Sequence, residues 1–237
     1  MTIMTRPTGP ASTGSDFEAV IGQLTQPVGG QYPRPWMTSL RDPMQARVFI
    51  VGRHQVKNYP IRLVGSHGRH MDALFNRNGE DCRELYDEIT NGEPSPTRSN
   101  LDNLTLRLAQ HGIRDVLETN VICYSTTMSK VLARPEHVRS AANGEEIFRA
   151  LLTHIRPPVL IVHGAKTAKE LAQCIGVRLP CPPDRPEDVR LVQVMYGGQS
   201  MAVVVMPSLA PPEFNKWMRW ADAHLNLVAR SVANHLR

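Results

Sequence analysis

The chain has 237 residues, of which 41% are hydrophobic and 21% charged, and its 27 Lys+Arg against 22 Asp+Glu give a net charge of +5. This length and composition predict one globular domain with a full core, and no apolar run approaches the roughly 20 residues that span a bilayer. A small positive charge is compatible with a polyanionic partner such as DNA but does not require one. Because the N-terminus lacks the apolar centre of a signal peptide, we expect a cytoplasmic protein without a membrane partner.

Metal and cofactor signatures are missing from the sequence. The four cysteines are scattered, without a CxxC pair: Cys82, Cys123, Cys174 and Cys181. Zinc and iron–sulfur sites usually need closely spaced pairs, so we expect buried free thiols and no metal. The glycine-rich signatures GxxxxGK[ST] and GxGxxG are also absent, and we expect no cofactor.

The N-terminal third contains a tail, a helix and a strand. Residues 1–15 are rich in Thr, Ser, Gly and Pro, which predicts a disordered tail and leaves 16–237 as a single domain. Apolar residues at helical spacing predict a helix over Phe17–Leu24, followed by an irregular segment that Trp36 anchors. The apolar run Val48–Gly52 predicts a strand buried on both faces, which Gly52 ends.

Helices and strands alternate along the rest of the chain. The expected helices are Cys82–Ile89, a segment around Leu101–Leu108 that Ser99 or Asn100 caps, Glu145–Ile155, Ala168–Ile175 and a closing helix over Phe214–Leu236. The expected strands are Val116–Tyr124, Val159–Val162 and a hairpin of Val189–Tyr196 with Met201–Val205. This alternation predicts a three-layer α/β/α sandwich with a central, mainly parallel four-stranded sheet.

Polar loops follow the expected strands and begin at Arg53, Asn120, Gly164 and Met206. The carboxyl ends of parallel strands are where ligands bind in open α/β sheets. Asn120 interrupts an apolar run, so its amide either bonds neighbouring backbone or faces a ligand. The turn at Gly164 exposes backbone N–H groups that suit a phosphate, although an ordinary strand-to-helix turn has the same sequence character.

Five short motifs succeed one another along the chain, four of them at these strand ends and one before a helix. They are GRHQVKNYP at 52–60, FNRNG at 75–79, ETNV at 118–121, VHGAKTA at 162–168 and MPSL at 206–209. In this order they resemble motifs of the uracil-DNA glycosylase superfamily, and the resemblance runs from about residue 46 to residue 217. It implies that superfamily's fold and a nucleobase pocket.

The resemblance also implies roles for individual residues. A flipped base would stack on Phe75, the Asn120 amide would read its edge, and Leu209 would fill the gap in the duplex. Gly164, Lys166 and Ser208 would contact DNA phosphates. The substrate pocket would also include Gly52, Arg53, Tyr59 and Met206.

The chain departs from the superfamily where the chemistry takes place. Arg53 and His54 stand where relatives carry Glu, Asp or Asn, and Met206 stands where His or Asn donates to the base. A thioether donates no hydrogen bond. The nearby candidates for holding the attacking water are His54 as a neutral imidazole, Gln55 and Asn58.

The expected function is therefore that of a monomeric DNA glycosylase of base excision repair. It would bind DNA, flip a uracil or another deaminated base, and hydrolyse its N-glycosidic bond without a metal. Two alternatives remain: a non-catalytic nucleic-acid-binding module on the same fold, and an enzyme acting on a free nucleoside or nucleotide. The four-loop arrangement predicts that His54, Phe75, Asn120 and Met206 line one cavity.

Overall fold

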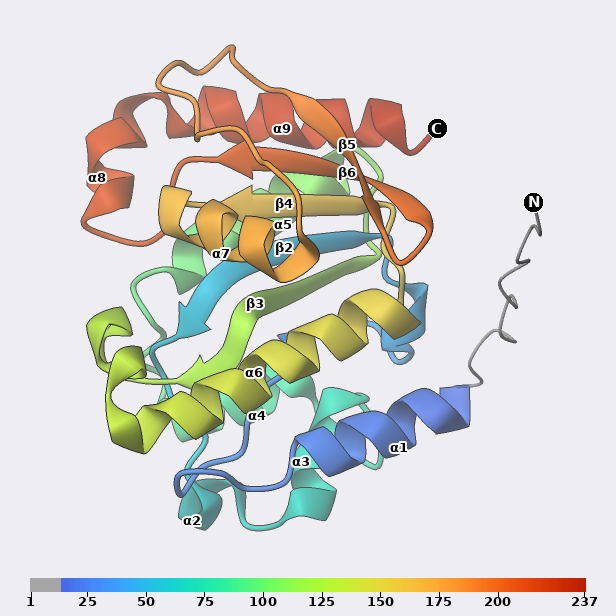
Figure 1. The fold of residues 1–237 in the computed structure, drawn as a ribbon, viewed down its shortest axis with the longest axis vertical. Helices are drawn as coiled ribbons and strands as arrows, with labels where there is room; N and C mark the ends of the chain where they lie inside the picture. The colour runs from blue at the N-terminus through green and yellow to red at the C-terminus, as the bar shows by residue number, and fades with distance from the viewer. Residues whose placement is uncertain (1–13) are drawn as a thin grey trace, which may run out of the picture.

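A six-stranded sheet in the order β1-β3-β2-β4-β6-β5 runs through the middle of the protein (Figure 1), in a computed structural model that describes residues 14–237. The strands are β1 (Trp36–Met37), β2 (Val48–Gln55), β3 (Val116–Ser125), β4 (Val159–His163), β5 (Leu191–Tyr196) and β6 (Gln199–Met206). The four inner strands are parallel, and the two edge strands run antiparallel to their neighbours. Each edge of the parallel sheet is thus closed by an antiparallel strand.

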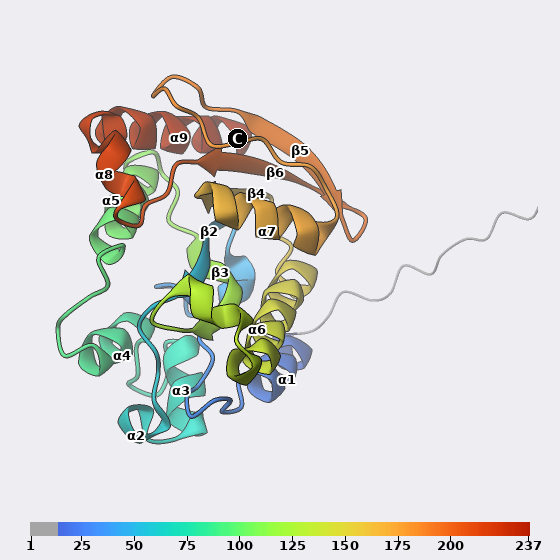
Figure 2. The ribbon, with the colours of Figure 1, turned by 60° about the vertical axis from the view of Figure 1, so that its left-hand side comes forward.

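Helices cover both faces of this sheet (Figure 2). They are α1 (Gly14–Leu24), α2 (Ile61–Val64), α3 (His67–Leu74), α4 (Cys82–Ile89), α5 (Arg98–Gln110), α6 (Pro135–His154), α7 (Ala165–Ile175), α8 (Glu213–Trp217) and α9 (Ala221–His235), with short 3-10 turns η1 (Pro43–Gln45), η2 (Ser129–Ala133) and η3 (Met218–Trp220). Helices α6 and α7 pack on one face, and α5 and α9 on the other. None of the described helices is both long and apolar enough to cross a membrane.

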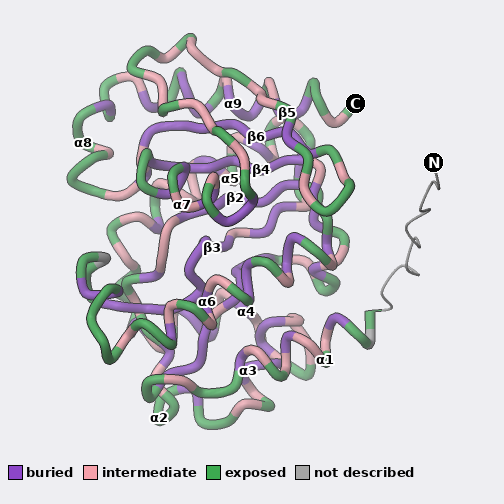
Figure 3. Tube along the Cα trace, in the orientation of Figure 1, coloured by how far each residue is buried: buried purple, intermediate pink, exposed green. Residues whose placement is uncertain are grey.

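The buried residues of the inner strands form the cores on the two sides of the sheet (Figure 3). Val48 and Ile50 face α5 and α9, whereas Phe49 and Val51 face α6 and α7. This alternation follows from the period of two along a strand, and burial of both faces explains why the sequence reads as a continuous apolar run.

The predicted mainly parallel α/β architecture is confirmed, but the sheet has six strands rather than four. The two-residue strand β1 is too short to leave a sequence pattern. Strand β2 does not end at Gly52 but continues to Gln55, so Arg53 and His54 lie within the sheet and not in a loop. The hairpin of β5 and β6 forms as expected, over the turn at Gly197 and Gly198.

Several predicted boundaries are wrong. Residues 1–13 of the expected tail lie outside the described residues, and α1 begins at Gly14. Helix α5 begins at Arg98, so neither Ser99 nor Asn100 is its cap. Helix α6 begins at Pro135, ten residues before the expected start at Glu145, because proline is well suited to the first helical position. The closing helix is divided into α8, η3 and α9.

The strand order creates a crevice at the carboxyl end of the sheet. The chain passes from β2 to β3 on one side, and β4 then lies on the other side of β2 and leads outward to β6. Connections that leave two adjacent parallel strands in opposite directions open a crevice between them, and ligands bind there. In Figure 1 these strand ends point to the left, toward α8 and the start of α7.

Candidate functional site

A cleft of about 860 Å³ lies at this crevice. Its walls come from segments far apart in the sequence, namely the ends of β2 and β3, the turn from β4 into α7, the loop after β6, and α8 with η3. Figure 2 turns the carboxyl ends of the parallel strands toward the viewer. Seven of the predicted site residues line it: Arg53, His54, Gln55, Asn120, Gly164, Lys166 and Ser208.

The floor of the cleft is shaped by the missing side chain of Gly52. A Cβ atom on Gly52 would lie 2.5 Å from Asn120 Oδ1 and 3.0 Å from His163 Nε2. Both distances are shorter than normal contacts, so only glycine allows the amide and the imidazole to approach the strand here. Gly52 and Asn120 are partners in the register of β2 and β3, so parallel pairing aligns them. The Asn120 side chain makes no hydrogen bond to any described residue.

His163 ends β4 and is a neutral hydrogen-bond donor. Burial lowers the pKa of His163 to about 4, so the ring carries no charge at neutral pH. Its Nδ1 accepts a bond of 3.4 Å from the backbone N–H of Leu209, which leaves the proton on Nε2. The N–H therefore lies on the same side as the Asn120 amide, above Gly52.

His54 is a second neutral imidazole at the end of β2. Burial, and next the positive charge of Arg53, lower its pKa to about 4. Its Nε2 is buried and has no hydrogen-bond partner among the described residues. An unpaired buried nitrogen is costly unless a ligand or a water occupies the position beside it. Arg53 itself is held by Glu170 of α7, at 2.8 and 2.6 Å from its Nε and Nη2 atoms.

A small inner cavity of about 60 Å³ continues the cleft beneath Asn120 and His163. It holds a carboxylate, Glu118, but both Glu118 oxygens accept bonds of 2.6 Å from Arg98. Tyr86 and Arg34 line both cavities, and the Arg34 guanidinium lies 5.0 Å from the centre of the Tyr86 ring. Nη1 of Arg34 is buried and has no hydrogen-bond partner in the described part of the chain.

The lining of the cleft carries an excess of positive charge. It contains six Lys and Arg side chains and only two carboxylates, those of Asp184 and Glu213. Four of the cations form no ion pair with a described residue: Arg34, Lys57, Lys166 and Arg219. This excess favours an anionic ligand.

The turn from β4 into α7 adds backbone donors to the cleft. Gly164 has a φ of +96°, a conformation that favours glycine, and no side chain caps the helix that follows. Ser208 packs against this turn, since a Cβ on Gly164 would lie 3.4 Å from its Cβ. The free N–H groups of the first turn of α7 suit a phosphate oxygen.

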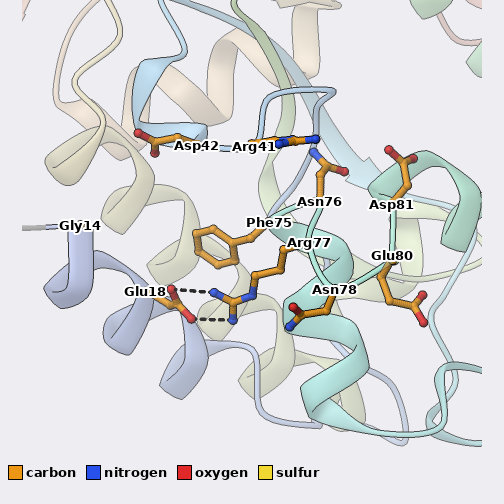
Figure 4. Close-up of a pocket in the computed structure, with 11 residues that line it drawn as sticks. Gly14, Glu18, Arg41, Asp42, Phe75, Asn76, Arg77, Asn78, Glu80 and Asp81 are labelled. Carbon is orange, nitrogen blue, oxygen red and sulfur yellow. Dashed lines mark hydrogen bonds and ion pairs between the residues drawn. The ribbon is translucent and has the colours of Figure 1, made fainter.

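The expectation that Phe75 and Met206 share the cavity with His54 and Asn120 is wrong. Phe75 lines a different hollow of about 760 Å³, where Arg77 lies over its ring (Figure 4). The ring also packs edge-on against Trp36. Met206 is completely buried in the core beneath α5 and α9. In the register of β4 and β6, Met206 is the partner of His163. The side chain that lines the cleft at this position is therefore that of His163, on the neighbouring strand.

Four further predicted site residues lie elsewhere or have structural contacts. Leu209 is completely buried, and its carbonyl accepts a bond of 2.8 Å from Asn100. Tyr59 is buried beside His70, and Asn58 is exposed outside the cleft. Gln55 lines the cleft, but its side-chain amide donates to the Arg34 carbonyl and accepts from the Ser125 hydroxyl. Its side chain therefore stabilises the surrounding structure and is not available to hold a water.

Sequence reasoning missed several residues of this site. Glu118 had a detectable signal because it lies two residues before Asn120 on β3 and so shares its face, and His163 because it directly precedes Gly164 at the end of β4. Tyr86 and Trp220 had none, since α4 and η3 reach the cleft only through the tertiary fold.

The described residues contain no cluster of His, Cys, Asp and Glu that could hold a metal ion. All four cysteines are free thiols, of which Cys181 is exposed and not buried as expected. A scan against models of known protein families finds no match to the chain, and no curated protein is significantly similar to it in sequence.

Proposed function

We propose that the protein binds DNA, holds a damaged base in the cleft and hydrolyses its N-glycosidic bond. The observation that carries the proposal is the convergence of the Asn120 amide and the His163 imidazole on the space left free by Gly52. An amide offers both a donor and an acceptor, which is what the Watson–Crick edge of a base requires. We place this activity on a uracil-DNA-glycosylase-like fold in the cytoplasm.

We assign to His163 the role expected of Met206. When the bond from the sugar C1′ to the base nitrogen breaks, the electron pair remains on the base. A neutral Nε2–H directed at a base carbonyl stabilises this charge without itself losing a proton. The low pKa of His163 keeps the ring neutral, and its position in register with Met206 brings a donor to the same edge of the sheet.

We assign to His54 the orientation of the attacking water. With a pKa of about 4, it is too weak a base to remove a proton before the glycosidic bond has broken. Its unpartnered Nε2 can still accept a hydrogen bond from a water, which then adds to C1′ as the base departs. The water passes its proton to solvent, and the base anion takes up a proton, so the products are a sugar hydroxyl and a neutral base. Lys57, Lys166 and the first turn of α7 would hold the adjacent phosphates.

The test is incubation of the purified protein with single- and double-stranded oligonucleotides that contain uracil, hypoxanthine or xanthine. We expect alkali-labile abasic sites with at least one of these bases. His163→Phe should lower the rate of the chemical step by about a hundredfold and leave DNA affinity nearly unchanged. Asn120→Asp should change base preference, and an unchanged preference would remove Asn120 from the pocket.

A second candidate is a nucleic-acid-binding module without catalysis. It is favoured by Glu118, the carboxylate of the inner cavity, because its two bonds to Arg98 leave it unavailable to assist the reaction. DNA binding without any abasic product from the three damaged bases would favour this candidate.

A further inference from the structure

The part of the cleft that η3 and the proline-rich segment before β5 line, here called the outer end, is built differently from the floor around Gly52. Trp220 lines this end, next to the exposed Arg219 on the same turn η3. The Trp220 ring is only half-buried, and its indole N–H donates to no described residue. Trp217, by contrast, is buried and donates to the Ser208 carbonyl at 2.8 Å. Trp220 is thus the tryptophan of this pair that is free to meet a ligand.

The surroundings of Trp220 hold the ring in place. It packs against Trp217, with 5.1 Å between ring centres, and edge-on against His224 at 5.3 Å. His224 is buried, and its Nδ1–H donates to the Pro186 carbonyl at 2.8 Å. This bond fastens the proline-rich segment before β5, whose Pro182 and Pro183 also line the cleft. The outer end is therefore a prearranged pocket with one half-exposed indole ring, that of Trp220, and two prolines.

We propose that this outer end is a subsite for a neighbouring nucleotide of a single DNA strand, whose base stacks on Trp220 while Arg219 contacts the phosphate. This inference rests on the proposed nucleic-acid ligand, but not on catalysis. An aromatic ring beside unpaired cations in a groove is the combination that binds single strands without reading their sequence. A second base held outside the pocket also explains why the cleft is larger than one base requires.

The test compares a short single-stranded thymidine oligonucleotide with thymidine monophosphate, by fluorescence anisotropy and by competition. Trp220→Ala should weaken oligonucleotide binding about tenfold, and monophosphate binding should not change. Trp220→Phe should restore most of the loss, because a phenyl ring still stacks. Met218→Ala is the matched control, since Met218 lies on the same turn and is exposed but does not line the cleft. Thermal melts check that each variant is folded.

Equal oligonucleotide affinity of Trp220→Ala and the wild type would overturn the inference, and so would a wild type that binds no oligonucleotide. The proposed function is tested separately by base excision. If Trp220→Ala weakens strand binding and no base is ever released, the subsite stands and the glycosylase proposal fails. If bases are released and Trp220→Ala binds the oligonucleotide as tightly as the wild type, the glycosylase proposal stands and the subsite fails.

Discussion

The two large hollows of this protein are of similar size, about 860 Å³ for the cleft and about 760 Å³ for the hollow around Phe75, but their polar groups differ. Each of the four carboxylates that line the Phe75 hollow has a partner: Glu18 binds Arg77, Glu80 binds Arg69, and Asp42 and Asp81 accept backbone N–H groups. The cleft instead contains the buried, unpaired atoms Arg34 Nη1 and His54 Nε2, and four of its cations form no ion pair with a described residue, against one, Arg41, in the Phe75 hollow. Unsatisfied groups therefore distinguish the two hollows better than volume does.

Acid should produce the largest effect, because buried neutral histidines lie in the cleft and none lines the Phe75 hollow. The folded state holds the pKa of His163 and His54 at about 4, below their ordinary 6.5, so between these values the unfolded chain binds more protons. Stability should fall as the pH falls from 6.5 to 4, by roughly 3 kcal/mol for a fully buried group. Urea unfolding across this range measures it.

His163→Phe should lose less stability over the same pH window, because one of the titrating groups has gone. An equal loss in both proteins would show that His163 is not a buried neutral base. His70, which is also completely buried with its pKa lowered to about 4, remains as an internal reference in the variant.

Gly52→Ala should lower the activity of the cleft about a hundredfold without unfolding the protein. The new methyl group would displace the Asn120 amide and the His163 ring, and a shift of about 1 Å in such groups costs roughly a hundredfold in rate. Single-turnover excision measures this effect. Gly22→Ala is the control, because a Cβ there meets only Met71 Cε at 3.7 Å. A fully active Gly52→Ala would contradict the site.

Phe75→Ala should reduce stability and leave activity unchanged. The ring packs against Trp36 and Phe17, with 5.6 and 6.4 Å between ring centres, so its loss should lower the free energy of unfolding by about 2 kcal/mol. Denaturant unfolding measures the loss of stability, and the KM for an oligonucleotide, compared with that of the wild type, shows whether binding has changed. A raised KM at equal stability would return Phe75 to the binding site.

Lys166→Ala should have the smallest effect. Lys166 is exposed in the cleft and forms no ion pair with a described residue, so its removal should weaken DNA binding several-fold and lower the slope of log affinity against log salt by about one. Arg41→Ala in the Phe75 hollow is the matched control and should leave the slope unchanged. Equal slopes in the wild type, Lys166→Ala and Arg41→Ala would show that DNA does not contact Lys166 in the cleft.

The sequence predicted the strands that carry the site because buried parallel strands are continuous apolar runs. It placed His54 and Asn120 correctly in one cavity, although both lie within neighbouring parallel strands, on the same face, and not in loops that follow them. It failed for Phe75, Met206 and Leu209 because a motif fixes a position along the chain but not the direction of a side chain. The strand order, which makes His163 the neighbour of Met206, follows from tertiary packing and cannot be predicted from the local hydrophobic pattern of the sequence.

The strand order also determines when the cleft can exist. Its walls extend from Arg34 to Trp220, and the four parallel strands that support them are completed only when β6 has paired with β4. Such long-range pairing is slow, and a chain still being synthesised cannot complete it until its last quarter has emerged. A molecule that binds in the cleft therefore recognises only a chain in which β6 has paired with β4, and stabilises it against unfolding, so ligand-dependent melting reports on completion of the sheet.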